Sequence, residues 1–275
     1  MVQSDGLFRY DGRCVVVTGC ASGIGAALAQ LVSGLGAHVV GLDVRPPAAD
    51  FGVAEFHAVD LADEGSIADA VATLDGPVDA LFNVAGVSSG IKDPLRVVTI
   101  NFLGMRRFTE ALIPLMPPGS AIANVSSLAA SQYLANASVT LGLLDTGSFA
   151  EGVEWCQHHP DALADGGYRL SKEAIILYGM RAVTALGTKG IRVNCTAPGV
   201  TDTPILDQLR GAYGQGFLDA FSNPLGRHAD ADEQASVLAF LNSAAARHIT
   251  GHVIWVDGGT VAEREFDQLR AKDLS

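Results

Sequence analysis

Short runs of β-branched residues alternate with Ala- and Leu-rich helical stretches along most of the chain. The runs predict strands at 13–18, 38–43, 55–59, 80–84, 121–125, 191–196 and 253–256. The clearest helical stretches between them cover 23–36, 63–74 and 168–188. Because the runs are apolar on both faces, they indicate a parallel sheet that is covered on both sides. Right-handed crossovers then predict a single α/β domain over 1–275, a Rossmann-type doubly wound sheet of about seven parallel strands with helices on both faces.

Three segments interrupt this alternation. Residues 128–167 form a long insertion between a predicted strand and a predicted helix, and loops beyond roughly 12–15 residues are uncommon in compact domains. Residues 201–227 contain four glycines and are interpreted as a substrate loop. The charged residues 262–275 are interpreted as a C-terminal tail.

The composition limits the partners of this chain. A formal net charge of −12 at pH 7 argues against nucleic acid and against anionic membrane surfaces, so we expect neither partner. With 48% hydrophobic and 17% charged residues, the chain is expected to build a substantial core. We identify no membrane span and no signal peptide. The four cysteines are far apart, which disfavours a disulfide framework and a zinc ribbon, so we expect a cytoplasmic protein without a metal.

The first predicted strand leads into a glycine-rich loop, residues 18–25, with the sequence TGCASGIG. Its glycines allow a sharp turn and a close approach to a pyrophosphate, and the next helix offers free N–H groups and a partial positive charge. The spacing differs from the common G-x-G-x-x-G fingerprint, and tight strand–helix packing is the alternative interpretation. As a dinucleotide site, the loop binds through Gly19, Ser22, Gly23, Ile24 and Gly25.

An acidic residue, Asp43, ends the second predicted strand. A carboxylate there can bond both hydroxyls of an adenosine ribose and repels a 2′-phosphate. The glycine loop has no Lys or Arg to offset that repulsion, and Arg45 weakens the argument only slightly. We therefore expect NAD as the cofactor, with NADP less favoured. Asp60 and Leu61 are predicted at the adenine edge, and a helix cap is the alternative.

Six motifs occur in the order found in the short-chain dehydrogenase/reductases, and the chain resembles that family over residues 10–260. The motifs are the loop 18–25, N-V-A-G at 83–86, Asn101, Ser126-Ser127, Tyr168-x-x-x-Lys172 and Pro198-Gly199. Val84 departs from the family's usual N-A-A-G. The resemblance implies an NAD(P)-dependent alcohol dehydrogenase or carbonyl reductase.

Hydride transfer at an alcohol carbon requires a proton transfer at the alcohol oxygen. Tyr168 can make that transfer because Lys172, four residues on, shares its helix face and lowers a pKa that is ordinarily about 10. The resemblance implies that Tyr168 is the general acid or base, that Lys172 also binds the nicotinamide ribose, and that Ser127 holds the substrate oxygen. It also implies that Asn101 orders a water relay to Lys172, a role compatible with a structural one in holding a helix bulge.

The resemblance places further cofactor contacts after the fourth and sixth predicted strands. Asn83, Ala85 and Gly86 are expected on the adenosine side, and Pro198, Gly199, Val200 and Thr203 at the nicotinamide, with Thr201 as the competing hydroxyl.

Within the family, the insertion and the glycine loop resemble the bacterial 3α-hydroxysteroid dehydrogenase/carbonyl reductases and the coniferyl-alcohol dehydrogenase-like group. We expect the insertion to cover the substrate side of Tyr168, and its Leu and Val content suits a lipophilic ligand. The predicted substrate is a lipophilic secondary alcohol or ketone of the 3α-hydroxysteroid type, with an aryl-propenyl alcohol as the alternative. Outside the enzymes, the alternative is a catalytically silent NAD(H)-binding sensor or scaffold. The resemblance also implies a homodimer or homotetramer.

Overall fold

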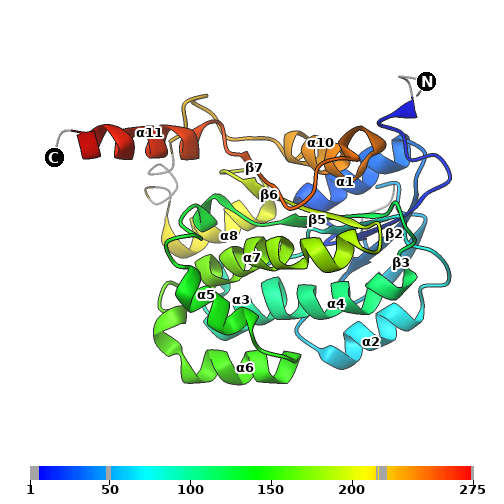
Figure 1. The fold of residues 1–275 in the computed structure, drawn as a ribbon, viewed down its shortest axis with the longest axis horizontal. Coiled ribbons are helices and arrows are strands. Elements are labelled where there is room, and N and C mark those ends of the chain that lie inside the picture. Colours follow the sequence, from blue (N-terminus) through cyan, green and yellow to red (C-terminus); the bar gives the residue numbers. More distant parts are fainter. Residues whose placement is uncertain (1–5, 48–50, 215, 217–221, 274–275) are drawn as a thin grey trace.

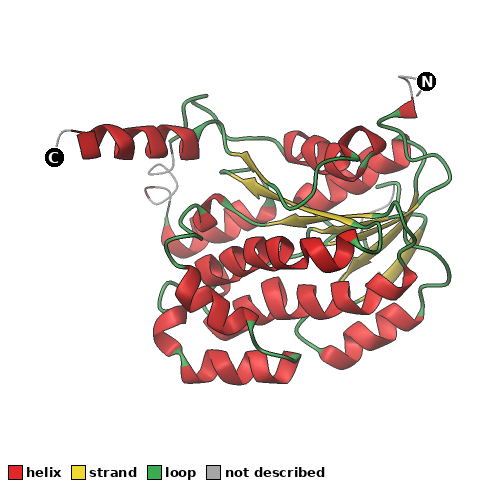
Figure 2. Cartoon of the chain, viewed as in Figure 1, coloured by secondary structure: helices red, strands yellow, loops and turns green. Residues whose placement is uncertain are grey.

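The computed structural model describes residues 6–47, 51–214, 216 and 222–273. Its strands form one parallel sheet in the order β3-β2-β1-β4-β5-β6-β7, with helices on both faces (Figures 1 and 2). The strands are β1 (Cys14–Thr18), β2 (His38–Asp43), β3 (Glu55–Ala58), β4 (Ala80–Asn83), β5 (Ala121–Val125), β6 (Arg192–Pro198) and β7 (Val253–Val256). This confirms the predicted doubly wound α/β fold.

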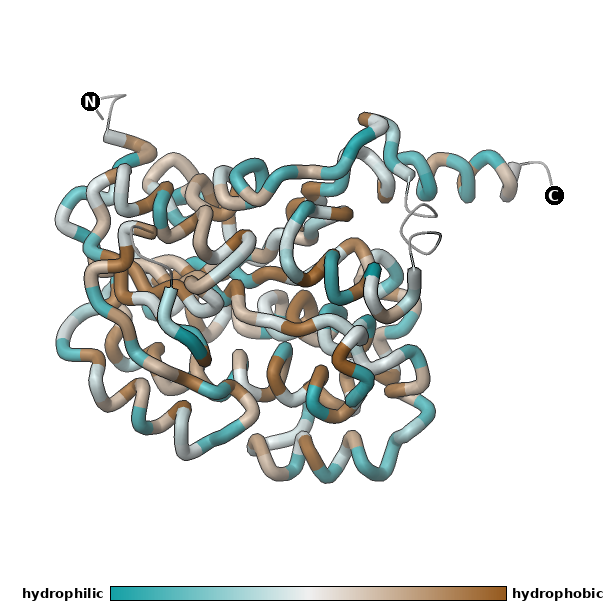
Figure 3. The backbone as a smooth tube through the Cα atoms, turned by 180° about the vertical axis from the view of Figure 1, so that it is seen from behind, coloured by the Kyte–Doolittle hydropathy of each residue, from teal (hydrophilic) through white to brown (hydrophobic). Residues whose placement is uncertain are grey.

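Helices α1 and α10 cover one face of the sheet, and α2, α4 and α7 cover the other (Figure 1). The helices of the described chain are α1 (Gly23–Gly34), α2 (Glu64–Ala72), α3 (Pro94–Val98), α4 (Met105–Leu112), α5 (Ala137–Leu144), α6 (Phe149–His158), α7 (Tyr168–Gly187), α8 (Pro204–Tyr213), α10 (Ala231–Asn242) and α11 (Thr260–Asp273). The interior of the molecule is hydrophobic along the central strands (Figure 3).

Alternate residues of β1 supply the two halves of the core. Val15 and Val17 pack with α1 and α10, whereas Val16 packs with Phe108 and Leu112 of α4. All three valines are fully buried. Strands that are apolar on both faces therefore have a helix layer on each side, as the sequence pattern predicts.

The insertion 128–167 forms two helices, α5 and α6; α5 lies against α7, and α6 lies next to α5 and α3 (Figure 1). Leu143, Leu144 and Cys156 of these helices are buried in a third apolar cluster with Phe102 and Tyr178. The rings of Phe102 and Tyr178 meet edge to face, with centroids 6.3 Å apart. The apolar residues of the insertion thus extend the core.

The chain order places a topological switch point between β1 and β4, where connections leave the sheet in opposite directions. Open α/β sheets bind their ligands at such points, beyond the carboxyl ends of the strands. The loops after β1 and β4 contain two of the motifs noted in the sequence.

Two predicted irregular segments are partly helical. The segment 201–227 contains α8, while its residues 215 and 217–221 lie outside the described chain. The predicted tail 262–275 is mostly the helix α11, and its residues 274–275 also lie outside the described chain. In the described parts of the chain, no helix is both long enough and apolar enough to span a membrane.

Candidate active site

A cavity of about 880 Å³ opens at the carboxyl ends of the strands. Its walls come from the loops after β1 to β6, from the start of α7 and from α8. Of the predicted site residues, the cavity is lined by Gly19, Ser22, Gly23, Ile24, Gly25, Asp43, Asp60, Leu61, Ala85, Gly86, Ser127, Tyr168, Lys172, Pro198, Gly199, Val200 and Thr203. Segments far apart in the sequence therefore meet in one space.

The glycine loop is held by its backbone. The Gly19 N–H donates to the Leu42 carbonyl of β2 at 2.7 Å. Gly19 has a φ of 73°, and a Cβ atom there would come within 2.8 Å of the Ala85 backbone. Both the conformation and the close approach favour glycine, because an L side chain rarely adopts this φ. The loop after β1 thus lies directly against the loop after β4.

Thr18, at the end of β1, joins these two loops. Its hydroxyl oxygen accepts hydrogen bonds from the N–H groups of Val84 and Ala85, each at 3.1 Å. Thr18 is almost fully buried and was not among the predicted site residues. Its position immediately before Gly19 was the available signal, because the last residue of a strand can bridge to the neighbouring strand's loop.

The Asp43 carboxylate faces the cavity and holds the loop as well. One oxygen accepts from the Ala21 N–H at 3.1 Å, and the other accepts from the Arg45 N–H at 3.4 Å. Asp43 is only partly buried, so the carboxylate stays accessible to a ligand.

Asp60 and Leu61 line the same end of the cavity. The Asp60 carboxylate accepts from the Ala62 N–H at 2.8 Å and pairs with Arg96 at 3.3 Å. The alternative of a helix cap at Asp60 is wrong, because Asp63 is the residue that caps α2.

The prediction at Asn83 concerns a backbone contact with the cofactor and stays a prediction, whereas its side chain has a structural role. Asn83 is buried, and its amide donates to the Thr109 hydroxyl and the Asn124 carbonyl oxygen, each at 2.8 Å. As the last residue of β4, it points its side chain into the helix layer. The cavity wall begins one residue later, at Val84.

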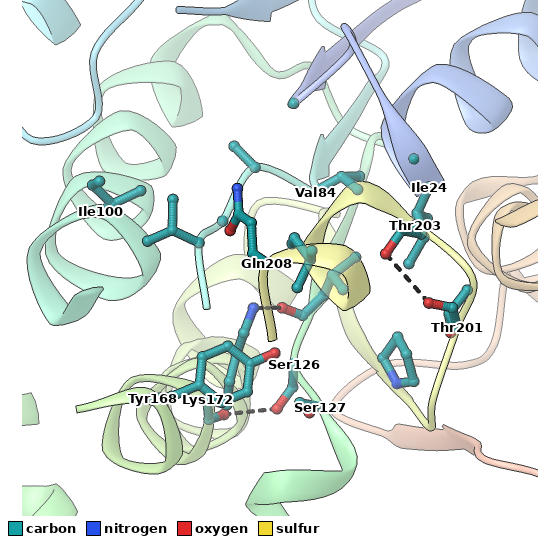
Figure 4. A pocket seen from close by; sticks show the side chains of 18 of the residues that line it. Ile24, Val84, Ile100, Ser126, Ser127, Tyr168, Lys172, Thr201, Thr203 and Gln208 are labelled. Atoms are coloured by element: carbon teal, nitrogen blue, oxygen red, sulfur yellow. Dashed lines mark hydrogen bonds between the residues drawn. The ribbon is translucent and has the colours of Figure 1, made fainter. Parts of the chain in front are cut away.

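Tyr168 and Lys172 project from the first turns of α7 towards the end of β5 (Figure 4). The Lys172 ammonium donates to the Val125 carbonyl at 2.9 Å and lies 5.6 Å from the centre of the Tyr168 ring. Burial lowers the pKa of Lys172 to about 8. Lys172 therefore remains mostly protonated at neutral pH and places a positive charge beside the tyrosine.

The two serines after β5 have different partners. The Ser126 hydroxyl is buried and donates to the Lys172 carbonyl at 2.7 Å. Ser127 is less buried and lies beside the Tyr168 hydroxyl (Figure 4). Burial raises the pKa of the Tyr168 hydroxyl, and a hydrogen bond with Ser127 offsets part of this rise. The Ser126 hydroxyl thus helps to hold α7 in place, whereas the Ser127 hydroxyl can bind a ligand oxygen together with Tyr168.

Asn101 does not line the cavity; it lies behind it, in a π-helical turn over Thr99–Gly104. Its amide accepts from the Val87 N–H at 2.8 Å, donates to the Val87 carbonyl at 2.9 Å and donates to the Ser171 hydroxyl at 3.2 Å. The side chain therefore ties the loop after β4 to the catalytic helix. A helix bulge at Asn101 is present, as the structural alternative predicted.

The loop after β6 closes the opposite wall. Thr203 precedes α8, and its hydroxyl donates to the Thr201 carbonyl at 3.3 Å (Figure 4). The Thr201 hydroxyl donates to the Gly199 carbonyl at 3.1 Å and accepts from Gln234 at 3.3 Å. Thr203 therefore has the less constrained hydroxyl of the two.

The expectation that the insertion covers the substrate side of Tyr168 is wrong for most of its length. Of residues 128–167, all of which the structure describes, Leu128, Ala129, Ser131 and Gln132 line the cavity. Helix α5 instead packs against α7, and α6 packs against α5 and the π-helical turn Thr99–Gly104. The sequence pattern could not distinguish helices packed on the core from a lid over a ligand, because both arrangements need apolar residues.

The rest of the cavity lining comes mainly from helix α8 and from the turns after β4 and β5, and α11 contributes Arg264. The apolar residues there are Ile91, Leu128, Ile205, Leu206 and Leu209, and the polar ones include Ser89, Gln132, Gln208 and Arg264. Gln208 and Arg264 were not predicted. No motif marks them, since only the packing of their helices brings them to the cavity.

Comparison with known proteins agrees with this arrangement. Residues 13–139 match the short chain dehydrogenase family, and residues 162–261 match the family described as enoyl-(acyl carrier protein) reductase. The chain is 36% identical over 252 residues to a coniferyl-alcohol dehydrogenase from a Pseudomonas species, covering 91% of this chain and 97% of the relative. It is 34% identical over 251 residues to a 3-alpha-hydroxysteroid dehydrogenase/carbonyl reductase from Comamonas testosteroni, covering 89% and 95%.

A solved structure shows the same similarity. The 3-alpha-hydroxysteroid dehydrogenase from Pseudomonas sp. B-0831, complexed with NADH, has a TM-score of 0.79 and 30% identity to this chain. The match covers 91% of this chain and 98% of that chain. These findings confirm the family and the two groups that the sequence motifs indicated.

Proposed function

The chain belongs to the short-chain dehydrogenase/reductase family of oxidoreductases, and we propose that it is an NAD-dependent enzyme interconverting a lipophilic secondary alcohol and its ketone. A 3α-hydroxysteroid is the favoured type of substrate. The observation that carries the proposal is the grouping of Tyr168, Lys172 and Ser127 in a cavity between a glycine loop and an apolar end.

The residues present fit a nicotinamide dinucleotide. The contact between Gly19 and Ala85 leaves a backbone surface without side chains, against which a pyrophosphate can lie. Asp43 would bond the adenosine ribose, and Gly199, Val200 and Thr203 would hold the nicotinamide. When bound, the cofactor accepts or supplies the hydride. The open carboxylate of Asp43 favours NAD, and the similar enzyme complexed with NADH supports that choice.

Tyr168 would take the proton from the alcohol oxygen during oxidation and return it during reduction. The Lys172 charge favours the ionised tyrosine, which opposes the effect of burial. Ser127 would hold the substrate oxygen against Tyr168. Asn101 acts as a positioning residue, because its bonds to Val87 and Ser171 hold the two walls together.

The substrate class rests on the apolar lining beyond Tyr168 and on the names of the similar enzymes. A coniferyl-type, aryl-propenyl alcohol is the second candidate, favoured by the 36% identical relative. We also propose a cytoplasmic location, consistent with four free cysteines. A homodimer or homotetramer is expected, and it would have to accommodate α5 and α6 on the outer side of α7.

The test is the change in nicotinamide absorbance with 3α-hydroxysteroids, cinnamyl-type alcohols and small secondary alcohols, each with NAD and NADP. We expect turnover with NAD and a lipophilic alcohol, and a loss of about 10²–10⁴-fold in kcat for Tyr168→Phe with NADH binding retained. NADH binding without turnover of any alcohol would instead indicate a sensor. Turnover that survives in Tyr168→Phe would disprove the assignment of the catalytic base.

Asp43→Asn tests the preference for NAD. The amide keeps an oxygen for the Ala21 N–H but removes the charge that repels a 2′-phosphate. We expect the KM for NADP to fall about tenfold relative to that for NAD, a change of about 1.4 kcal/mol. An unchanged ratio would mean that Asp43 does not select the cofactor.

A further inference from the structure

Among the described residues, five basic side chains line the cavity, and most of them already have a partner or a role. They are Arg45, Arg96, Arg169, Lys172 and Arg264. Arg96 pairs with Asp60 at 3.3 Å, and Arg169 pairs with Asp165 at 2.6 Å. Lys172 belongs to the catalytic group, and Arg45 follows Asp43 at the nucleotide end. Arg264 is left, with no carboxylate pairing to it among the described residues.

Arg264 comes from the helix that ends the described chain, and the start of this helix is firmly held. The buried Asp257 carboxylate accepts from the Gly259 N–H at 3.0 Å and from the Val261 N–H at 2.7 Å. A Cβ atom at Gly199 would come within 2.8 Å of the Asp257 Cα atom. The first turn of α11 is therefore anchored to the loop expected to hold the nicotinamide.

Arg264 lies about one helical turn after Val261, in the helix α11 that extends away from the body of the molecule (Figure 1). It lines the same cavity as Leu206, Gln208 and Leu209 of α8. The Arg264 side chain is exposed to solvent.

The carboxylates of the cavity wall do not compensate this charge. Asp43 holds the glycine loop, Asp60 pairs with Arg96, and Asp93 caps α3 by accepting from the Arg96 N–H. The chain as a whole carries a net charge of −12, which repels anions. An anionic ligand would therefore depend on a local cation, and a planar guanidinium matches a carboxylate with two parallel hydrogen bonds.

We propose that Arg264 is a specificity-determining residue that binds a carboxylate on the substrate, at the end remote from the reacting alcohol. The substrate class is then a lipophilic secondary alcohol that also carries an acid group. This inference rests on the proposed function, because it concerns the same cavity and the same reaction.

The test compares a 3α-hydroxysteroid that has a side-chain carboxylate with its methyl ester. The variants are Arg264→Gln, which removes the charge, and Arg264→Lys, which keeps it without the planar fork. Arg270→Gln is the matched control, since Arg270 lies on the same helix, is exposed and does not line the cavity.

For the acid, we expect Arg264→Gln to raise KM about tenfold with kcat unchanged, and Arg264→Lys to have an intermediate effect. The ester should respond to neither variant, and Arg270→Gln should leave both substrates unchanged. Equal changes for acid and ester, or an equal effect of Arg270→Gln, would overturn the proposal.

A binding measurement separates this inference from the proposed function. Calorimetric titration of the acid and the ester into wild-type protein and Arg264→Gln requires no turnover. Weaker binding of the acid alone to Arg264→Gln supports the assignment, even if wild-type protein oxidises neither compound and the proposed function fails. Acid binding that is absent, or equal in the two proteins, overturns it.

Discussion

The two ends of the cavity are built from different parts of the chain. At the nucleotide end, the glycine loop contributes backbone to the wall, and hydrogen bonds such as Gly19 N–H to Leu42 and Ala85 N–H to Thr18 hold it. At the substrate end, the wall is made of side chains from α8 and α11 and from the turns after β4 and β5. A backbone wall tolerates few substitutions, whereas a side-chain wall can change its chemistry while the sheet stays the same.

The largest effect is expected from Gly19→Ala at the nucleotide end. The added methyl group would contact the Ala85 backbone and the φ of 73° would be strained, so the loops must separate. We expect the Kd for NADH to rise about 100-fold, measured by fluorescence titration. Gly34→Ala in α1, where a Cβ meets nothing within 4 Å, is the control. If both variants bind NADH like wild type, the backbone wall is not what holds the cofactor.

Glu173→Gln should weaken the packing of the insertion on α7. It should change neither the nucleotide end nor the substrate end of the cavity directly. This fully buried carboxylate accepts from the Asn136 amide at 2.6 Å and the Thr140 hydroxyl at 3.1 Å, and pairs with Arg169 at 3.1 Å. We expect the free energy of unfolding in urea to fall by about 2 kcal/mol, because Asn136, Thr140 and Arg169 would then face a neutral amide in place of the buried carboxylate.

The exposed Glu154→Gln on α6 is the matched control for Glu173→Gln. NADH affinity should stay near the wild-type value in both variants. An unchanged unfolding curve for Glu173→Gln would show that the insertion does not depend on this bond cluster to hold α7.

Leu209→Ala tests how much an apolar side chain at the substrate end contributes to substrate binding. Leu209 is half-buried on α8 and lines the cavity. Losing its apolar area should raise the KM for a lipophilic alcohol about fivefold, or about 1 kcal/mol, without changing the Kd for NADH. Leu141→Ala, an exposed leucine of the insertion, serves as control. An effect on NADH alone would contradict the assignment of the two ends.

Lys172 gives the smallest expected effect, in the pH dependence of stability. Burial lowers the pKa of Lys172 in the folded protein to about 8, below the ordinary lysine value of 10.5, so between these pH values the unfolded chain binds more protons. Stability from this group therefore rises with pH across that window. From pH 7 to 9, wild type should gain about 1 kcal/mol relative to Lys172→Met in urea unfolding. If the free energies of unfolding of wild type and Lys172→Met change in parallel with pH, burial does not disfavour the charged form of Lys172.

The sequence predicted the sheet correctly, and the residues that it assigned to the glycine loop line the cavity, because both depend on local patterns. Strand runs such as 121–125 are apolar throughout, and glycine at 19 has few substitutes where two loops touch. At Asn83 the motif does not reveal which way the strand-end side chain points, and the structure shows its amide bonded to Thr109 and Asn124.

The substrate end could not be predicted in the same way. Arg264 reaches the cavity only because Asp257 anchors α11 beside Gly199, a contact between segments far apart in the chain. The leucines of 128–167 suggested a lipophilic ligand, but Leu143 and Leu144 lie in a core cluster with residues of α7 instead. Packing between helices decides both the place of Arg264 and the place of the insertion. A single sequence carries no direct signal of how helices pack.

For protein engineering, the burial of apolar residues of α5 and α6 means that the insertion cannot simply be deleted, whereas residues of the cavity wall can be substituted. Cutting out the insertion to shorten the enzyme would bare Phe102 and Tyr178 to water and invite aggregation. The residues of α8 that line the cavity, together with Arg264 of α11, can be exchanged in libraries at lower risk, because most of them are not buried. A search for new substrates is best concentrated on those two helices.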